Sequence, residues 1–80
     1  MGTIKILFFG ATADVAGTRH IKLEVAENMT SKLVFDDLLG RFPQLSTHRL
    51  HYSINQQYAT GDELVRDGDE LAIFTAVSGG

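Results

Sequence analysis

The residues of this sequence with the most specific chemical use are the last two, Gly79 and Gly80. Because glycine has no Cβ, a final glycine leaves its carboxylate unhindered and lets the residues before it adopt any φ. Extended, residues 76–80 span about 17 Å, which would let them thread a narrow channel into a neighbour's active site. A carboxylate becomes a good electrophile once it is an acyl adenylate, and sulfur attack on that adenylate gives a thiocarboxylate. The pattern predicts a carried group on Gly80, with Gly79 and Ser78 as the threading segment.

Other chemistry is sparse. The chain has no cysteine, which excludes a disulfide scaffold, a thiolate metal site and a cysteine nucleophile. The histidines His20, His48 and His51 have no carboxylate partners at ligand spacing, so no metal site is predicted. Acidic residues gather at 62–70, where Asp is expected in turns, and a solvated rim is favoured over a steering patch for a basic partner. No phosphate loop or nucleophile elbow is present, so we expect neither an active site of its own nor a bound cofactor.

The composition describes one small folded domain. The chain has 80 residues, 44% of them hydrophobic, and a formal net charge of −3. The acidic balance argues against nucleic-acid binding. No apolar run approaches the length of a membrane span, and no secretory signal is visible, so we expect a cytoplasmic protein without a membrane partner.

The first half of the chain predicts two strands and a helix. Residues 3–9 are short, apolar and β-rich, and residues 19–25 alternate cleanly, so the two should pair as a hairpin. The segment 10–17 between them predicts a loop with a helical turn. Thr30 or Ser31 can cap a helix that runs to about Phe42 and is stopped by the following proline.

The second half completes a sheet. Leu50, Tyr52 and Ile54 alternate as a third strand, residues 55–56 form a turn, and a short segment follows around Tyr58. A tight turn then leads into a last strand at 71–75. The order β, β, α, β, β, β predicts an α+β fold, the ubiquitin-like β-grasp, with a mixed sheet of about five strands and one main helix on one face. Residues 1–75 form this domain, and residues 76–80 are predicted to be a flexible tail.

One face of this sheet is unexpectedly apolar. If alternate residues of the first strand face the helix, Leu7 and Phe9 point to the other side, as Ala72 and Phe74 do on the last strand. A single helix covers only one face, so this strip indicates a docking surface. The alternative is that loops cover these residues as part of the core.

The sequence also resembles a known family. The opening IKILFFG, the central INQ at 54–56 and the closing DGDELAIFTAVSGG resemble the small subunit of molybdopterin synthase, over nearly the whole chain. Two positions depart from that family: Thr75-Ala76 stand where many relatives have Pro-Pro, and Ala13-Asp14 where relatives often have Arg-Glu. Neither departure touches the terminal glycines.

The resemblance implies a function. In this family an enzyme related to ubiquitin activators consumes ATP to adenylate the last glycine, here Gly80, which is then thiocarboxylated. The tail inserts into the large synthase subunit, within a heterotetramer, and gives sulfur to cyclic pyranopterin monophosphate to build the dithiolene of the molybdenum cofactor. The small subunit is active only with the large one. The resemblance implies partner contacts at Phe9, Phe74 and Tyr58, and the alternation of the first strand adds Leu7 to this predicted surface.

Two other functions are open. A sulfur carrier or ubiquitin-like modifier of another pathway, such as thiamine synthesis, tRNA thiolation or protein conjugation, would use the same adenylate on Gly80. A plain β-grasp interaction module would have an inert C-terminus, and deleting Gly79 and Gly80 would then leave its function intact.

Overall fold

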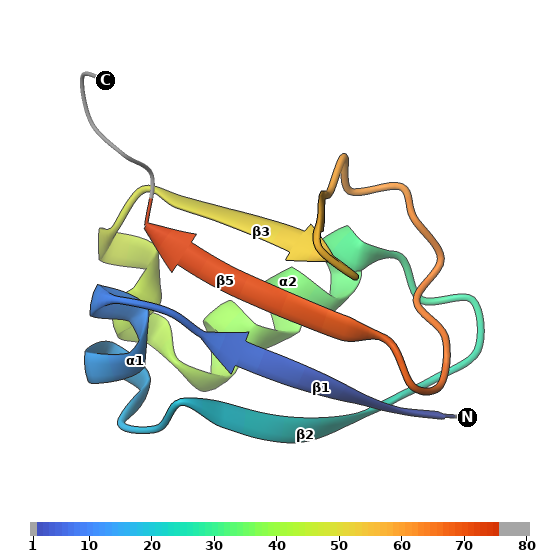
Figure 1. The fold of residues 1–80 in the computed structure, drawn as a ribbon, viewed down its shortest axis with the longest axis horizontal. Helices are drawn as coiled ribbons and strands as arrows, with labels where there is room; N and C mark the ends of the chain where they lie inside the picture. Colours follow the sequence, from blue (N-terminus) through green and yellow to red (C-terminus); the bar gives the residue numbers. More distant parts are fainter. Residues whose placement is uncertain (1, 76–80) are drawn as a thin grey trace.

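The computed structural model describes residues 2–75, which form one sheet with helices packed beside it (Figure 1). Its elements, in chain order, are β1 (Gly2–Phe8), α1 (Ala11–Ala16), β2 (His20–Val25), α2 (Ser31–Arg41), the 3-10 helix η1 (Pro43–Thr47), β3 (Leu50–Ile54), β4 (Gln57–Tyr58) and β5 (Glu70–Thr75). The predicted mixed sheet of about five strands with one main helix is confirmed. None of the helices in the described part of the chain is long and apolar enough to cross a bilayer.

The sheet has the strand order β2-β1-β5-β3-β4. Its two central strands, β1 and β5, are parallel, and Phe8 lies opposite Ile73. The flanking pairs are antiparallel, including the predicted hairpin of β1 and β2. The C-terminal strand therefore lies in the middle of the sheet, between the first and the third strand of the chain.

Alternation along the central strands places every second side chain in the core. Ile4 and Ile6 of β1 are at most 1% exposed, and Leu71 and Ile73 of β5 are fully buried. These side chains face α2, which crosses that side of the sheet (Figure 1). The inward face predicted from the period of two is confirmed.

The main helix has the predicted boundaries. The Thr30 hydroxyl caps it by accepting the Leu33 N–H at 3.3 Å. Val34 and Leu38 are fully buried against the sheet. The helix ends at Arg41, because Pro43 cannot donate a hydrogen bond to continue it and instead begins η1. The 3-10 helix η1 was not predicted.

The segment between β1 and β2 is more regular than predicted. Instead of a loop with one helical turn it contains the six-residue helix α1, bracketed by Gly10 (φ 59°) and Gly17 (φ 76°). Both glycines have positive φ, which L side chains avoid. Short helices have little intrinsic stability in water, so packing against β5 must support α1.

Acidic residues at 62–70 build the turns around β5. The Asp67 carboxylate accepts the Thr3 N–H at 2.8 Å, and that of Asp69 accepts the Arg66 N–H at 2.8 Å and the Asn55 amide at 3.1 Å. The acidic cluster thus has a local structural role, which agrees with the expectation that Asp occurs here for backbone reasons.

Glu63 fastens this loop to the main helix. Its carboxylate accepts hydrogen bonds from the buried Ser31 hydroxyl at 2.6 Å, the Thr60 N–H at 2.6 Å and the Gly61 N–H at 3.0 Å. These bonds, the one from Ser31 first, lower the pKa of Glu63 to about 2 from its ordinary value of 4.5.

We expect Glu63 to make the fold acid-sensitive. Because its pKa is lower in the folded chain, Glu63 contributes stability above pH 4.5, and this contribution is lost as the pH falls toward about 2. Glu63→Gln should unfold more easily near neutral pH and lose less stability over that acid range, as measured by urea unfolding at several pH values. Ser31→Ala should reduce the acid-dependent loss in part. Equal pH dependence of the Gln variant and the unsubstituted chain would contradict this assignment.

Candidate functional site

The sheet face opposite α2 carries the predicted docking residues. Leu7 of β1 lies beside Ala72 of β5, and both point away from the core. Phe9 directly follows β1 and stays on the sheet, because its N–H donates to the Ile73 carbonyl at 3.0 Å. Phe9 is 51% exposed. The strip that alternation predicts is therefore present and open to solvent; we call this sheet face the outer face.

Three aromatic rings form a cluster on the outer face. The Phe74 ring centroid lies 5.9 Å from that of Tyr58 and 6.1 Å from that of His51, and His51 and Tyr58 are 6.3 Å apart. Cross-strand pairing explains this, since His51 lies opposite Phe74 and Tyr58 lies opposite Ser53. Tyr58 is 76% exposed, while Phe74 is half-buried among its neighbours. Aromatic residues in such a cluster are typical of interface hot spots.

The four predicted contact residues thus share one face. Leu7, Phe9, Phe74 and Tyr58 come from β1, its end, β5 and β4, and none belongs to the buried core. Their role in partner binding stays a prediction, but the alternative that loops cover the apolar strip as part of the core is wrong for Phe9. Leu7 and Phe74 are partly buried and contribute a smaller exposed area.

His51 is a member of this face that sequence reasoning missed. A signal was present: Leu50, Tyr52 and Ile54 alternate toward the core, so His51 and Ser53 must point outward. The structure also separates His51 from His48, which caps the end of η1. Within residues 2–75, no group of three or more His, Asp or Glu side chains is placed to hold a metal ion.

The predicted carrier residues come shortly after β5 in the sequence. Thr75, the last described residue, pairs with Leu50 at the start of β3. Ser78, Gly79 and Gly80, together with the predicted tail 76–80, lie outside the described residues. Phe74 of the outer face directly precedes Thr75 in this strand, so a protein bound on Phe74 would lie next to the last described residue.

A buried hydroxyl fixes α1 at this end of β5. Thr12 is fully buried, and its hydroxyl lies 2.6 Å from the Phe9 carbonyl and 3.1 Å from the Ile73 carbonyl. It thereby joins the helix to both central strands just before Phe74. Both carbonyls also accept a backbone N–H, so each keeps one partner without the hydroxyl.

We expect Thr12→Val to destabilise the chain by about 1 kcal/mol, the usual net value of one hydrogen bond. Thr18→Val is the matched control, because the Thr18 hydroxyl bonds the His20 carbonyl at an exposed position; its cost should stay below about 0.5 kcal/mol. Urea unfolding of both variants measures the difference. Equal losses would show that the Thr12 hydroxyl does not join α1 to β5.

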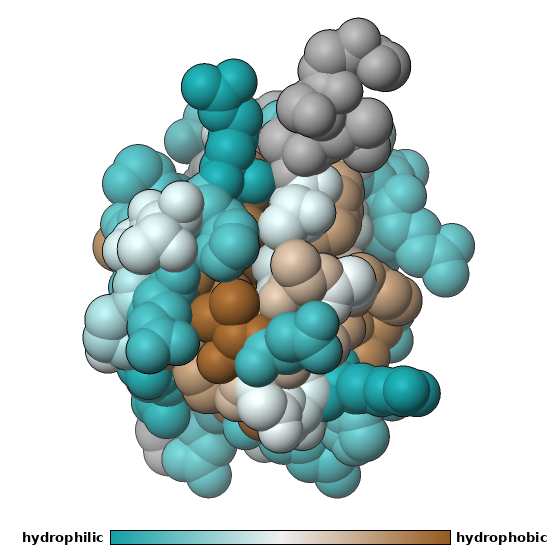
Figure 2. All heavy atoms as spheres, turned by 90° about the vertical axis from the view of Figure 1, so that its left-hand side faces the viewer, coloured by the Kyte–Doolittle hydropathy of each residue, from teal (hydrophilic) through white to brown (hydrophobic). Residues whose placement is uncertain are grey.

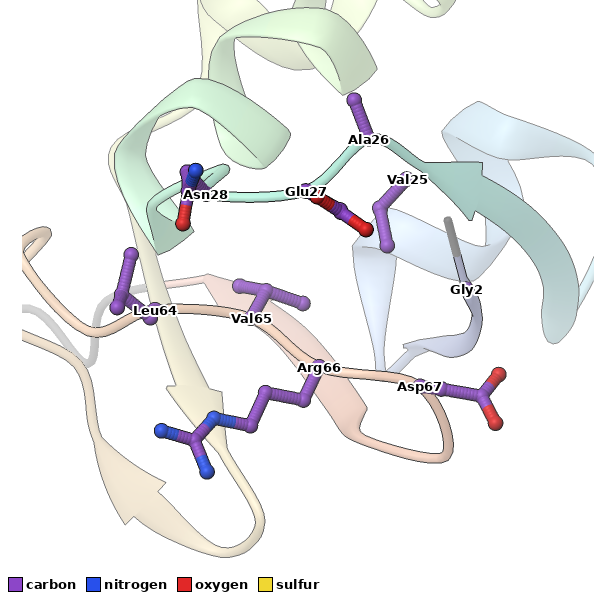
Figure 3. Close-up of a pocket in the computed structure, with 9 residues that line it drawn as sticks. All are labelled: Gly2, Val25, Ala26, Glu27, Asn28, Leu64, Val65, Arg66 and Asp67. Atoms are coloured by element: carbon purple, nitrogen blue, oxygen red, sulfur yellow. The ribbon is translucent and has the colours of Figure 1, made fainter.

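Two cavities among the described residues show which side chains a ligand would meet. One of about 300 Å³ lies between segments 25–28 and 64–67 (Figure 3). Val25 and Val65 point toward each other across it, while the Arg66 side chain points away. The Asp67 carboxylate at its edge is bonded to the Thr3 N–H. The floor of this cavity is apolar, and the carboxylate at its edge already holds a turn. The residues that line it include no cysteine, serine or histidine that could act as a nucleophile or base.

A second hollow adjoins the outer face. It has a volume of about 500 Å³ and is lined by Leu7, Phe8, Phe9, Gly10, Ala13, Asp14, Arg19 and His20. It therefore extends the apolar strip past Phe9 toward α1 and the start of β2. This arrangement suits docking of a protein side chain better than chemistry on a small molecule.

Comparison with known proteins gives consistent results. The model of the ThiS family matches residues 6–80. The molybdopterin synthase sulfur carrier subunit of Arabidopsis thaliana is 32% identical over 79 residues, which cover 96% of this chain and 82% of that protein. The small archaeal modifier protein 1 of Haloferax volcanii is 33% identical over 82 residues, covering 90% and 94% of the two chains.

Solved structures agree with the fold. The crystal structure of SAMP1 from Haloferax volcanii superposes with a TM-score of 0.85 at 31% identity, over 99% of this chain and all of that one. Urm1 from Trypanosoma brucei superposes with a TM-score of 0.71 at 17% identity, covering 99% and 96% of the two chains, and shows likeness of fold alone. The predicted ubiquitin-like β-grasp is confirmed.

Proposed function

Because this chain belongs to the ThiS family, we propose that it is a sulfur carrier, and specifically the small subunit of molybdopterin synthase. The observation that carries the proposal is the match to sulfur carrier subunits over 96% of the chain. The family match also extends to Gly80, the residue whose carboxylate would carry the sulfur.

The chemistry needs only the terminal carboxylate from this chain. A Gly80 carboxylate oxygen attacks the α-phosphorus of ATP on a separate activating enzyme, which releases pyrophosphate and leaves an acyl adenylate. Sulfur at the oxidation level of sulfide, delivered by a donor as HS⁻, then attacks the acyl carbon and expels AMP, giving the thiocarboxylate without any change of oxidation state. That sulfur is passed to cyclic pyranopterin monophosphate, and two such transfers build the dithiolene. The tail ends as a carboxylate again and can be reloaded.

The large subunit would supply the acid, base and pterin pocket. In this proposal it docks on the outer face through Phe9, Phe74, Leu7 and Tyr58, and it receives Ser78, Gly79 and Gly80 in its active site. Support comes from the exposed aromatic cluster, which lies on the strand that leads into these residues. Two small subunits on a large-subunit dimer would complete the heterotetramer.

The proposal is tested by the intact mass of the protein. The chain is incubated with ATP, an adenylating enzyme of the ubiquitin-activating type and a sulfur donor. A mass gain that corresponds to replacing one carboxylate oxygen by sulfur is expected. If the mass stays unchanged although the same enzyme adenylates another carrier, the proposal is wrong. Addition of the large subunit and the pterin substrate should then return the original mass.

A second function is favoured by one specific observation. The chain is 33% identical to a protein named as a modifier, and the structure of that protein matches closely. A modifier would use the same Gly80 adenylate but end in an isopeptide bond to a lysine. Conjugates of increasing mass in a cell extract, dependent on Gly80, would favour the modifier over the carrier.

A further inference from the structure

Charge is distributed unevenly between the two ends of this molecule. The end at which β1 and β5 finish, here called the β5 end, holds Thr75, the last described residue. Figure 2 looks onto it and shows hydrophilic side chains around a smaller apolar patch. The opposite end holds the start of β1 and the turns before β5.

Two arginines mark the β5 end. The Arg19 carbonyl accepts the N–H of Phe8, the last residue of β1, at 2.8 Å. Arg49 directly precedes Leu50, which pairs with Thr75. Both arginines are exposed, and within residues 2–75 neither forms an ion pair. Their guanidinium groups are therefore available to a partner.

Few acidic side chains lie at the β5 end to balance the charge of these two arginines. Arg41 is already paired with Asp37 at 2.9 Å. Asp14 on α1 is then the one unpaired acid among the described residues of this end, which gives it a formal charge of +1 with neutral histidines. All three histidines, at 20, 48 and 51, also lie here and can add only positive charge.

The opposite end is acidic. Since the chain has a net charge of −3, the remainder carries −4. The acids of this remainder lie in β2 and just after it, on α2, in the turns before β5 and at the start of β5: Glu24, Glu27, Asp36, Asp62, Glu63, Asp67, Asp69 and Glu70. The molecule is therefore an electric dipole whose positive end lies beside the segment that would enter a partner.

We infer that the protein that accepts this C-terminal segment presents an acidic rim around its entrance, which contacts Arg19 and Arg49. The inference rests on the proposed function, because it assumes that the segment is inserted. Residues 76–80 reach at most about 17 Å beyond Thr75, so the entrance must lie close to both arginines. The terminal carboxylate passes beyond the rim and takes no part in this contact.

The dipole would act mainly on the rate of association. A charge asymmetry rotates the approaching chain so that its positive end leads, and complementary rims raise association rates by one to three orders of magnitude. A basic partner surface would instead attract the end opposite to the C-terminus, which is unproductive. An acidic rim therefore also disfavours the wrong orientation.

The test uses the full chain and the purified large molybdopterin synthase subunit in stopped-flow binding. The double variant Arg19→Glu/Arg49→Glu should associate about tenfold more slowly than the unsubstituted chain at low ionic strength. The difference should vanish near 1 M salt, where the Debye length falls to about 3 Å. Lys32→Glu/Arg66→Glu, which changes the net charge equally at the other end, is the control and should alter the rate less than about twofold.

Equal slowing by both double variants would overturn the inference, because net charge alone would then explain it. Faster association of the Arg19→Glu/Arg49→Glu variant would also overturn it, since the rim would then be basic. If the unsubstituted chain binds no large subunit, the proposed function falls and the inference with it. Unchanged unfolding midpoints in all variants ensure that rates are compared between folded chains.

Discussion

Deletion of Gly80 is expected to abolish sulfur loading and sulfur transfer completely. The terminal carboxyl group would then belong to Gly79 and end about 3.3 to 3.6 Å short of its position in the full chain. A displacement of about 1 Å at a reacting centre can already cost about a hundredfold in rate. The chain has no cysteine, so no thiol can accept the sulfur in place of the terminal carboxylate. The intact mass after incubation with the activating enzyme, ATP and sulfur donor measures the loss.

A conservative variant distinguishes two requirements, the length of the C-terminal segment and the absence of a Cβ beside its carboxylate. Gly80→Ala keeps the length but places a Cβ beside the carboxylate, so loading should fall steeply if the acceptor channel excludes side chains. Gly40→Ala is the matched control, because a Cβ at this position on α2 meets nothing within 4 Å. This control should load sulfur like the unsubstituted chain. Full activity of a chain without Gly79 and Gly80 would instead support an interaction module with an inert C-terminus.

Phe74→Asp is expected to weaken binding of the large subunit at least about thirtyfold, corresponding to the 2 kcal/mol or more typical of an interface hot spot. Phe74 is central to the aromatic cluster, with Tyr58 and His51 on either side of it. A carboxylate there would be desolvated on docking without a partner. Leu33→Asp is the control: Leu33 is 52% exposed but lies on α2, which covers the other face of the sheet. Isothermal titration with the large subunit measures both affinities.

The fold should survive this change, because Phe74 is not part of the buried core. Cooperative urea unfolding of Phe74→Asp checks this point. Tyr58→Asp provides a second variant whose side chain, 76% exposed, contributes little to folding. Unchanged affinity in both variants would show that the partner docks elsewhere.

Much of the fold followed from local patterns. The period of two in 19–25 and the stripe of Val34 and Leu38 on the helix predicted which side chains are buried, because burial follows the geometry of one element at a time. Pro43 ended the helix for an equally local reason. The same reasoning missed η1 and predicted only a loop with a helical turn in place of α1, because such short helices depend on contacts from elsewhere, such as Thr12 with β5.

What the sequence by itself determined is which side chains of a strand or helix face the core; the sulfur-carrying role of the terminal glycines stays a prediction from the sequence. Only the tertiary structure decided which strands are neighbours. Tyr58 and Phe74 meet on the outer face because β5 inserts between β1 and β3, and Arg19 and Arg49 reach the same end of the molecule for that reason. The register between strands is set by pairing of segments that are far apart in the chain. The alternation within a single strand does not determine which segments pair. The aromatic cluster of the outer face and the uneven distribution of charge are therefore properties of the fold.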